Sequence, residues 1–400
     1  METFGHSHPL RVLGIGNARS VIFLRWAWRL RELGHDVHVV SDRFSARSEE
    51  LAGIGVHDIR TLGRLNNVRG VRRLRFGATI RALARELEID VVHGHYLLPY
   101  GFWAALAGHR PLVISPWGTD ILVEPGKGGE RLRRARAALS AADALVVNSA
   151  ANASACVRLG VDPERIEQVV WYADLGRFGP ELRDERFRAG LGWPDDAFVV
   201  LSLRNFRPDT NVDCVVRGFE RLLRAEPRAR LVLASKGGPL QAEVEALVDA
   251  LGLRNHVAFV TAHEAELPTV VASSDVLVAM TRSDSTPASL LEAMASERPA
   301  VCADAASIDE WIGHGDGGAI VPQLDEAALA AELLVLARDP ELRLRHGLRN
   351  RRYVAEHVTE PGPALDALYR RLVGAEAVVP SVSASPPAAT PAAAVAVARR

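Results

Sequence analysis

Short apolar runs alternate with amphipathic segments along nearly the whole chain, and this alternation limits the possible folds more than any other feature. The runs are rich in Val, Ile and Leu, as strands buried on both faces of a parallel sheet tend to be. The segments between them show the apolar period of a helix. This order predicts parallel sheets with crossover helices. The predicted strands are residues 10–15, 36–40, 56–59, 91–93, 112–115 and 144–147, then 198–203, 230–234, 257–260, 276–280, 299–303 and 319–321.

Length and composition predict two domains rather than one. A chain of 400 residues, 48% of them hydrophobic, is too long for one ordinary core. The predicted strands fall into two groups separated by a segment rich in Gly, Pro and charge at 174–197. We therefore predict an α/β fold of two doubly wound, Rossmann-like domains at 1–180 and 181–360. Residues 362–374 are expected to form a helix that packs back on the first domain, and the Pro/Ala-rich composition of 375–400 predicts a disordered tail.

Composition also limits the expected partners and location. The formal net charge of −1 gives no overall basic field of the kind that nucleic-acid binding needs, so no nucleic acid is expected. The absence of a signal pattern or a membrane-length apolar run predicts a cytoplasmic protein. The arginine-rich segment from Arg60 to Arg85 is either a solvated helix face or a peripheral contact with anionic lipid. The cysteines are isolated among apolar residues and are expected to be reduced core residues: Cys156, Cys214 and Cys302.

Two carboxylates lie close to the start of one predicted helix in the second half. The loop before this helix, 282–286, follows a predicted parallel strand, and ligands bind where such strands end and a helix N-terminus attracts phosphate. Thr286 is expected to cap the helix and Pro287 to occupy its first turn. Asp284 lies in the loop, and Glu292 lies eight positions later inside the helix. They are either ordinary solvated charges or acceptors for sugar hydroxyls beside a bound diphosphate.

The segment "SDSTPASLLEAMASERPAV" closely resembles the acidic-x7-acidic signature of the retaining glycosyltransferases of family 4, which have the GT-B fold. Four other segments resemble that family in the same order: "GHDVHVVSD", "VVHGHYLLPYG", "RPLVISPWGTDIL" and "EWIGHGDGGAIVP". The resemblance covers residues 10–372 approximately. Asp284 stands where the family usually has Glu, and Ser285 stands where it usually has Gly.

The resemblance implies a nucleoside-diphosphate sugar (NDP-sugar) as co-substrate and gives each residue of this segment a role. Asp284 would contact the transferred sugar, and Glu292 would contact the ribose of the nucleotide. Backbone amides near Ala288 and Ser289 would bind the distal phosphate. Ser285 and Thr286 belong to the same donor-binding loop.

A departing diphosphate needs positive charge, and this chain offers arginine rather than a metal site. Metal-dependent transferases commonly use an Asp-x-Asp pair, which the sequence lacks, so neither a metal nor another cofactor is expected. Arg204 follows a predicted strand at the position of the family's phosphate-binding arginine, and a guanidinium suits phosphate oxygens. The family's usual lysine a few residues later is missing. Arg207, or Lys236 in "LASKGGPL", is expected to replace it.

The first half supplies the acceptor side of the expected cleft. The dinucleotide fingerprint fails because its third glycine would fall on Arg19, which disfavours hydride transfer. By the resemblance, the loop at Gly16 and Asn17 faces the cleft between the domains, close to acceptor or phosphate. His95 ends a predicted strand and is a candidate to line this cleft. Trp117 stands where many relatives have a histidine near the reaction centre, with Asp120 three residues later.

These observations predict a retaining glycosyltransferase of the hexosyltransferase type. It would move a sugar from an NDP-sugar to a small-molecule or lipid-linked acceptor without a metal, with Asp284, Arg204 and Asp120 as the catalytic candidates. One alternative is an NDP-sugar epimerase or hydrolase on the same fold, because a fold does not fix a reaction. Another is an inactive nucleotide-sugar-binding protein, which Trp117, Tyr172 and the missing lysine favour.

Overall fold

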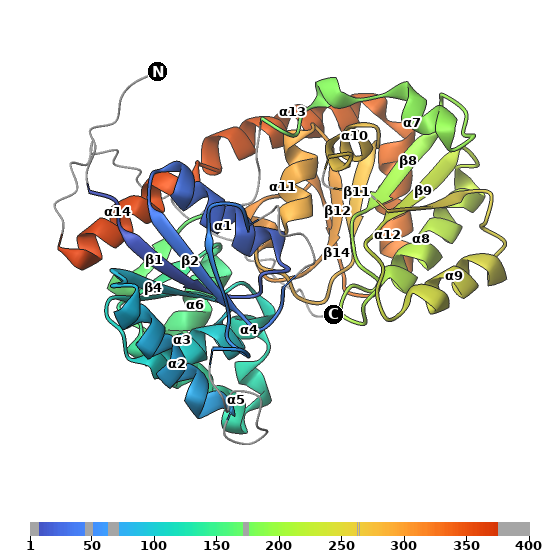
Figure 1. Ribbon diagram of the computed structural model, residues 1–400. Coiled ribbons are helices and arrows are strands. Elements are labelled where there is room, and N and C mark those ends of the chain that lie inside the picture. Colours follow the sequence, from blue (N-terminus) through green and yellow to red (C-terminus); the bar gives the residue numbers. More distant parts are fainter. Residues whose placement is uncertain are drawn as a thin grey trace, which may run out of the picture.

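The computed structural model describes residues 8–44, 51–62, 72–170, 176–261, 263 and 265–374. Two seven-stranded sheets form two lobes, which lie side by side in Figure 1. The first sheet has the order β3-β2-β1-β4-β5-β6-β7 and the second β10-β9-β8-β11-β12-β14-β13. Every pairing between neighbouring strands in both sheets is parallel. This is the two-domain α/β architecture that the sequence predicts.

The strands of the first lobe are β1 (Arg11–Ile15), β2 (Asp36–Ser41), β3 (Gly55–Asp58), β4 (Val91–His95), β5 (Leu112–Ser115), β6 (Ala144–Val147) and β7 (Ile166–Gln168). Its helices are α1 (Val21–Glu32), α2 (Arg72–Glu86), α3 (Phe102–Ala107), α4 (Thr119–Leu122), α5 (Gly129–Ala141) and α6 (Ala150–Arg158).

The strands of the second lobe are β8 (Phe198–Ser202), β9 (Ala229–Ala234), β10 (Val257–Val260), β11 (Val276–Ala279), β12 (Ala300–Ala303), β13 (Gly313–His314) and β14 (Gly317–Val321). The helices after the first lobe are α7 (Glu185–Gly190), α8 (Val212–Ala225), α9 (Gln241–Ala250), α10 (Leu267–Ala272), α11 (Ala288–Ala295), α12 (Glu326–Arg338), α13 (Pro340–His357) and α14 (Pro361–Val373).

Each predicted strand is present, with ends displaced by at most two residues. Two strands were not predicted, β7 and β13, and each lies at an outer edge of its sheet. Both are short, and their sequences, Ile-Glu-Gln and Gly-His, do not form an apolar run. Their sequences lack the continuous apolar pattern of a buried strand, whereas the edge strand β10, Val-Ala-Phe-Val, has that pattern and was predicted.

Each sheet has a point near its middle where the strand order reverses, and the second sheet has a further reversal at its edge, where β14 lies between β12 and β13. In the first sheet the middle reversal lies between β1 and β4, and in the second it lies between β8 and β11. The crevice at the carboxyl ends of two such strands is where open α/β sheets bind ligands. The loops that follow β8 and β11 therefore form the expected binding edge of the second lobe.

The last helix, α14, crosses back to the first lobe and lies against α1 (Figure 1). The hydroxyl group of Tyr369 in α14 accepts a hydrogen bond from the Trp26 indole N–H at 2.9 Å and contacts Nδ1 of His93 at 2.5 Å. Nε2 of His35 lies 3.0 Å from the Asp366 carboxylate. One apolar cluster, which includes Trp26, Leu290 and Tyr369, extends through both lobes, and the other two clusters are confined to one lobe each.

Some predicted features lie partly or wholly outside the described residues. They are the tail at 375–400, the segment that contains Tyr172, and residues 63–71 of the arginine-rich segment. Within that segment, the Arg81 guanidinium donates to the Ala107 carbonyl oxygen at the end of α3. None of the helices in the described ranges is both long and apolar enough to cross a bilayer. The domain boundaries at 180 and 360 stay predictions.

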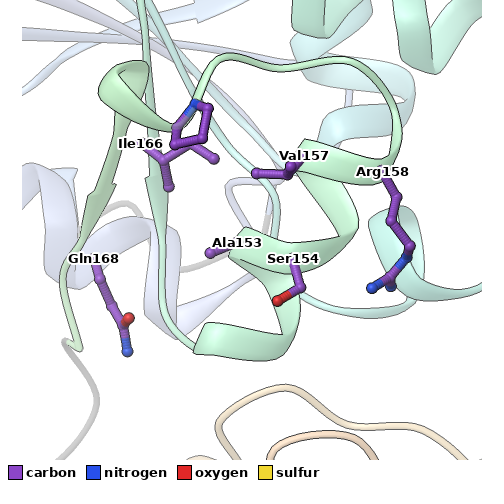
Figure 2. A pocket seen from close by; sticks show the side chains of 7 residues that line it. Ala153, Ser154, Val157, Arg158, Ile166 and Gln168 are labelled. Carbon is purple, nitrogen blue, oxygen red and sulfur yellow. The ribbon is translucent and has the colours of Figure 1, made fainter. Parts of the chain in front are cut away.

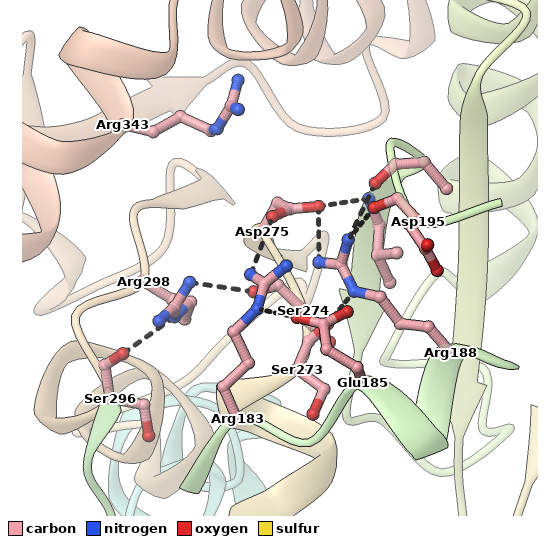
Figure 3. Close-up of polar contacts among 12 residues, drawn as sticks. Arg183, Glu185, Arg188, Asp195, Ser273, Ser274, Asp275, Ser296, Arg298 and Arg343 are labelled. Atoms are coloured by element: carbon pink, nitrogen blue, oxygen red, sulfur yellow. Dashed lines mark hydrogen bonds and ion pairs between the residues drawn. The ribbon is translucent and has the colours of Figure 1, made fainter. Parts of the chain in front are cut away.

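A buried arginine fixes the amino ends of the strands in the second lobe (Figure 3). Arg188 in α7 is 2% exposed and donates to the carbonyl oxygens of Ser273 at 2.9 Å and Ala197 at 3.0 Å. Its third contact is an ion pair of 3.0 Å with Asp275, which also accepts a hydrogen bond from the Val199 N–H. These contacts attach α7 to the starts of β8 and β11, the two strands beside the reversal.

Replacing Arg188 with Met is predicted to destabilise the second lobe by about 3–5 kcal/mol, because it leaves a largely buried carboxylate without its nearest cation. Differential scanning calorimetry measures this change. Arg186→Met, at an exposed position of the same helix, is the control and is expected to change the free energy of unfolding by about 0.5 kcal/mol at most. Equal stabilities of the two variants would contradict the structural role of Arg188.

Candidate active site

The loops at the reversal of the second sheet bring together two of the predicted catalytic residues. Arg204 lies two residues after β8, and Asp284 lies in the loop between β11 and α11. Nη1 of Arg204 is 2.9 Å from Oδ2 of Asp284, and about a fifth or less of each side chain is exposed. Arg204 and Asp284 therefore meet at the edge where a ligand of this fold is expected.

Arg204 has more donors than Asp284 uses. Its Nε and Nη2 atoms are buried and have no hydrogen-bond partner among the described residues. A buried N–H group that stays unpaired costs roughly 1–3 kcal/mol, and a charged one costs more. An anion bound beside Arg204 would remove this cost, so these donors suit a phosphate.

The start of α11 offers two further donors. The backbone N–H groups of Ala288 and Ser289 have no acceptor within the described part of the chain. The N-terminus of a helix attracts anions because its first amides are free and its dipole is positive there. The hydroxyl group of Ser289 is also buried without a partner in the same ranges. The two amides and the Ser289 hydroxyl are suitable donors for the distal phosphate. Phosphate binding at this helix stays a prediction.

The predicted helix cap at Thr286 is wrong. The residue at the N-cap position is Pro287, and no side chain caps α11. The hydroxyl group of Thr286 donates instead to the carbonyl oxygen of Asn148 in the first lobe, at 2.6 Å. Thr286 does not cap the helix because its hydroxyl group is bonded to the first lobe instead of to an amide of α11.

Glu292 lies in a helix that is buried along nearly its whole length. All residues from Ser289 to Ala295 are buried, and Glu292 itself is 6% exposed. A solvent-facing position, one of the two readings of the sequence, is thereby excluded for Glu292. A buried carboxylate needs polar partners, so the burial of Glu292 fits the reading in which it accepts hydrogen bonds inside the site.

Two side-chain amides hold the loops of this edge together. The Asn211 amide, at the start of α8, donates to the Met280 carbonyl oxygen at 2.7 Å. The Gln323 amide, after β14, donates to the carbonyl oxygens of Thr281 at 3.2 Å and Asp304 at 2.6 Å. The loops after β8, β11, β12 and β14 are thus linked to one another.

The two candidates to replace the missing lysine differ in their surroundings. Arg207 forms an ion pair of 3.0 Å with Asp209, and both side chains are exposed. Lys236 is exposed, and its backbone N–H donates to the Asn205 side chain at 3.1 Å. The Lys236 loop therefore lies beside the loop that carries Arg204, and the role of its side chain stays a prediction.

Gly16 and Asn17 follow β1 directly, at the reversal of the first sheet. A Cβ atom on Gly16 would lie 2.8 Å from the Phe23 ring, so packing alone excludes a side chain there. Asn17 is partly buried, and its side-chain oxygen accepts from the Arg19 N–H at 3.0 Å. The Gly16 loop thus rests on α1, and its contact with a ligand stays a prediction.

His95, a candidate to line the acceptor side, is completely buried. Its ring lies 4.0 Å from that of His93 and 4.4 Å from that of Trp26, measured between centroids. Burial lowers the pKa of His95 well below its usual value, so the ring is neutral near pH 7. The Trp117 ring lies 6.0 Å from it and is partly exposed. Of the two, Trp117 alone has surface for an acceptor.

Asp120 shapes the loop around Trp117. Its carboxylate is completely buried and accepts hydrogen bonds from the backbone N–H groups of Leu97 at 2.5 Å, Trp117 at 3.0 Å and Gly118 at 2.8 Å. Burial raises the pKa of Asp120 to about 6, although these N–H groups act in the opposite direction. The catalytic role of Asp120 stays a prediction. The contacts assign it a structural role.

The donor loop of the second lobe contacts the first lobe directly. The hydroxyl group of Ser285 donates to the carbonyl oxygen of Trp117 and accepts from the Asn148 amide at 2.9 Å. Gly118 has φ 150°, where glycine is favoured, and a Cβ there would lie 3.3 Å from the Ser285 hydroxyl oxygen. Ser285 and Trp117, two departures from the family pattern, are thus in contact.

Sequence reasoning missed two residues of this region, Asn148 and Glu310. Asn148 follows β6 in the first lobe. The Glu310 carboxylate, from the second lobe, accepts from the backbone N–H groups of Ala150 at 2.9 Å and Ala151 at 3.1 Å. A signal was available for Glu310, because it begins one of the family-like segments, but its partners lie about 160 positions away.

A separate cavity of about 500 Å³ lies between α6 and β7 (Figure 2). Its lining is mostly apolar, with Ser154, Arg158 and Gln168 as the polar members. None of the predicted site residues lines it. Within the described residues, no group of three or more His, Cys, Asp or Glu side chains is placed to hold a metal ion.

Each lobe matches a known family of glycosyl transferases. Residues 183–353 match the family "Glycosyl transferases group 1", and residues 11–149 match the family "Glycosyl transferase 4-like". The first range contains Arg204, Asp284 and Glu292, and the second contains Trp117 and Asp120.

Individual relatives support the same assignment. A D-inositol 3-phosphate glycosyltransferase from Kineococcus radiotolerans is 30% identical over 384 residues, which cover 86% of this chain and 88% of the relative. A protein of the same description from Catenulispora acidiphila is 32% identical over 272 residues, which cover 63% of this chain and 65% of the relative.

The fold has solved counterparts. The structure of Anabaena Alr3699/HepE in complex with UDP and glucose has a TM-score of 0.75 and 17% identity, and the match covers 91% of this chain and all of that one. At this identity the likeness shows the fold alone. The family itself is shown by the two family matches and by the Kineococcus radiotolerans relative. The chain belongs to the family 4 glycosyltransferases, hexosyltransferase-type enzymes with the GT-B fold.

Proposed function

We propose that this protein transfers a hexose from an NDP-sugar to a hydroxyl group of a small-molecule acceptor, with retention of the anomeric configuration and without a metal. The observation that carries the proposal is the pair of buried, unpartnered N–H donors of Arg204 beside Asp284 and the free amides of α11. Positive donors and one carboxylate at a single edge suit a diphosphate joined to a sugar.

The roles follow from the chemistry of these groups. Arg204 and the start of α11 bind the diphosphate, and Asp284 accepts from hydroxyl groups of the sugar. Glu292 accepts from the ribose. A structural neighbour described in complex with UDP and glucose supports a nucleotide sugar as the donor. The names of the relatives support a small phosphorylated polyol as the acceptor, in preference to a lipid-linked one.

The reaction needs stabilisation of the leaving group more than it needs a nucleophile. The bond between C1 of the sugar and the phosphate oxygen breaks, and the acceptor oxygen bonds to C1 on the same face. The acceptor proton passes to the departing phosphate oxygen. Arg204 and the amides of α11 stabilise the negative charge that develops there, which is the largest contribution in many enzymes. Asp284 holds the sugar in the orientation for attack.

Nucleoside diphosphates are predicted to raise the melting temperature of the protein, because a ligand that binds only the native state stabilises it. UDP, GDP and ADP, with their glucose conjugates, form the test panel in a thermal-shift assay. Arg204→Ala and Glu292→Gln are each expected to weaken binding of the best ligand by roughly tenfold to a hundredfold, since a hydrogen bond to a charged group contributes about 1.5–3 kcal/mol.

Arg224→Ala is the control for this assay, because Arg224 is exposed on α8 at the opposite end from the site and pairs with Glu220. It is expected to bind the ligand like the parent protein. If Arg204→Ala, Glu292→Gln and Arg224→Ala all keep the parental shift, the donor site lies elsewhere.

Product analysis is predicted to yield one glycoside with the anomeric configuration of the donor, formed only when an acceptor is present and in equal amount with EDTA. Proton NMR of the product measures the configuration, with inositol 3-phosphate as the first acceptor. Free sugar or epimerised donor without acceptor would identify the hydrolase or epimerase alternative. Donor binding without turnover on any acceptor would identify the inactive binding protein.

A further inference from the structure

The contacts between the lobes centre on the loop that is proposed to bind the donor. From the second lobe, Ser285 and Thr286 contact Trp117 and Asn148, which lie just after β5 and β6 of the first lobe. The residues from each lobe lie just beyond the carboxyl ends of parallel strands. The two binding edges thus touch through side chains of the donor loop itself.

Glu310 adds a second contact a short distance along the same interface. It lies in the short helix Ile308–Glu310 after β12, and its carboxylate accepts from Ala150 and Ala151 in the first turn of α6. Ser149 caps the next free amide, that of Asn152, at 3.1 Å. The first amides of α6 therefore bond to acceptors from both lobes, the Ser149 hydroxyl of the first and the Glu310 carboxylate of the second. The negative charge of Glu310 also interacts favourably with the positive end of the helix dipole.

The contacts of Ser285 and Thr286 are shielded from water, and the contact of Glu310 is partly shielded. Asn148, Ser285 and Thr286 are 3%, 2% and 4% exposed. Glu310 is more than half buried, and burial raises its pKa although the two N–H groups oppose the shift. The segment that carries Glu310 is itself fixed, because the Tyr353 hydroxyl in α13 donates to the Glu310 carbonyl oxygen at 2.9 Å. The buried hydrogen bonds of Ser285 and Thr286 are therefore stronger than hydrogen bonds at an exposed surface.

We propose that Ser285, Thr286 and Glu310 are positioning residues that couple donor binding in the second lobe to the geometry of the acceptor-side loops in the first. The backbone of the 285–289 segment holds the phosphate, while its side chains hold the Trp117 and Asn148 turns. Any shift of this loop on donor binding is therefore transmitted to both turns and to the start of α6. Such coupling is reciprocal, so the contacts between the lobes also affect donor affinity.

The first experiment follows hydrogen exchange at the amides of Ala150 and Ala151, by mass spectrometry with fragmentation to single residues. Glu310 is their only acceptor within the described residues. Glu310→Ala is expected to speed their exchange about tenfold, the equivalent of one lost hydrogen bond to a charged acceptor. Glu310→Gln keeps one acceptor oxygen and should give an intermediate rate, which guards against a misfolded Ala variant.

Asp309→Ala is the matched control, because Asp309 is the exposed neighbour of Glu310. It is expected to change the exchange of the two amides by about twofold at most. Parental exchange in both Glu310 variants would overturn the contact between Glu310 and α6, whatever the activity of the protein.

The second experiment rests on the proposed function and repeats the exchange measurement with UDP, GDP or ADP, whichever raises the melting temperature. That nucleotide is expected to slow exchange at Ala150 and Ala151, although it binds in the other lobe. Ser285→Ala removes the hydroxyl that joins Trp117 to Asn148, so the nucleotide should still raise the melting temperature but slow the exchange less. Ser296→Ala, which removes a buried hydroxyl without a described partner, is the control.

The outcomes separate the coupling from the proposed function. A nucleotide that raises the melting temperature but leaves both amides unchanged would overturn the coupling and preserve the donor site. If no nucleotide raises the melting temperature, the proposed donor site is wrong. The exchange measurement on the Glu310 variants still tests the contact between the lobes. Equal slowing in the parent and in Ser285→Ala would remove Ser285 from the coupling.

Discussion

Parallel pairing of every strand is the constraint on which the rest of this structure depends. It places the carboxyl ends of all seven strands of a sheet at one edge, and the reversal of strand order opens a crevice at that edge. Arg204 and Asp284 follow the two strands beside the reversal, so residues 80 positions apart form an ion pair. Arg188 supports the arrangement from the other end, because it fixes the starts of the same two strands.

The departures from the family pattern form a consistent set. The serine at position 285 replaces a usual glycine and bonds to the carbonyl oxygen of Trp117, which replaces a usual histidine. Asp120 holds the backbone of that turn with its buried carboxylate, and Gly118 leaves room for the serine hydroxyl. The Ser285 hydroxyl thus adds a contact between the lobes through the backbone of residue 117, and two N–H donors of Arg204 have no partner among the described residues.

The sequence predicted the strands well because buried parallel strands have a continuous apolar pattern, as in β6 and β12. It failed for β7 and β13, whose short polar sequences lack that pattern. Within the site, the convergence of Arg204 and Asp284 was predictable from the position of each after a strand. The contacts of Thr286 and Glu310 were not, because their partners lie about 140 to 160 positions away in the other lobe. Local rules assigned Thr286 to a helix cap that the tertiary contact replaced.

A crystal structure with a bound nucleoside diphosphate would show whether Arg204 and the start of α11 form the phosphate site. We expect the distal phosphate within hydrogen-bonding distance of the Arg204 guanidinium and of the amides at Ala288 and Ser289, with the ribose at Glu292. A diphosphate bound at the other edge of the sheet, or a nucleotide that leaves both unpaired donors of Arg204 without a partner, would contradict this expectation.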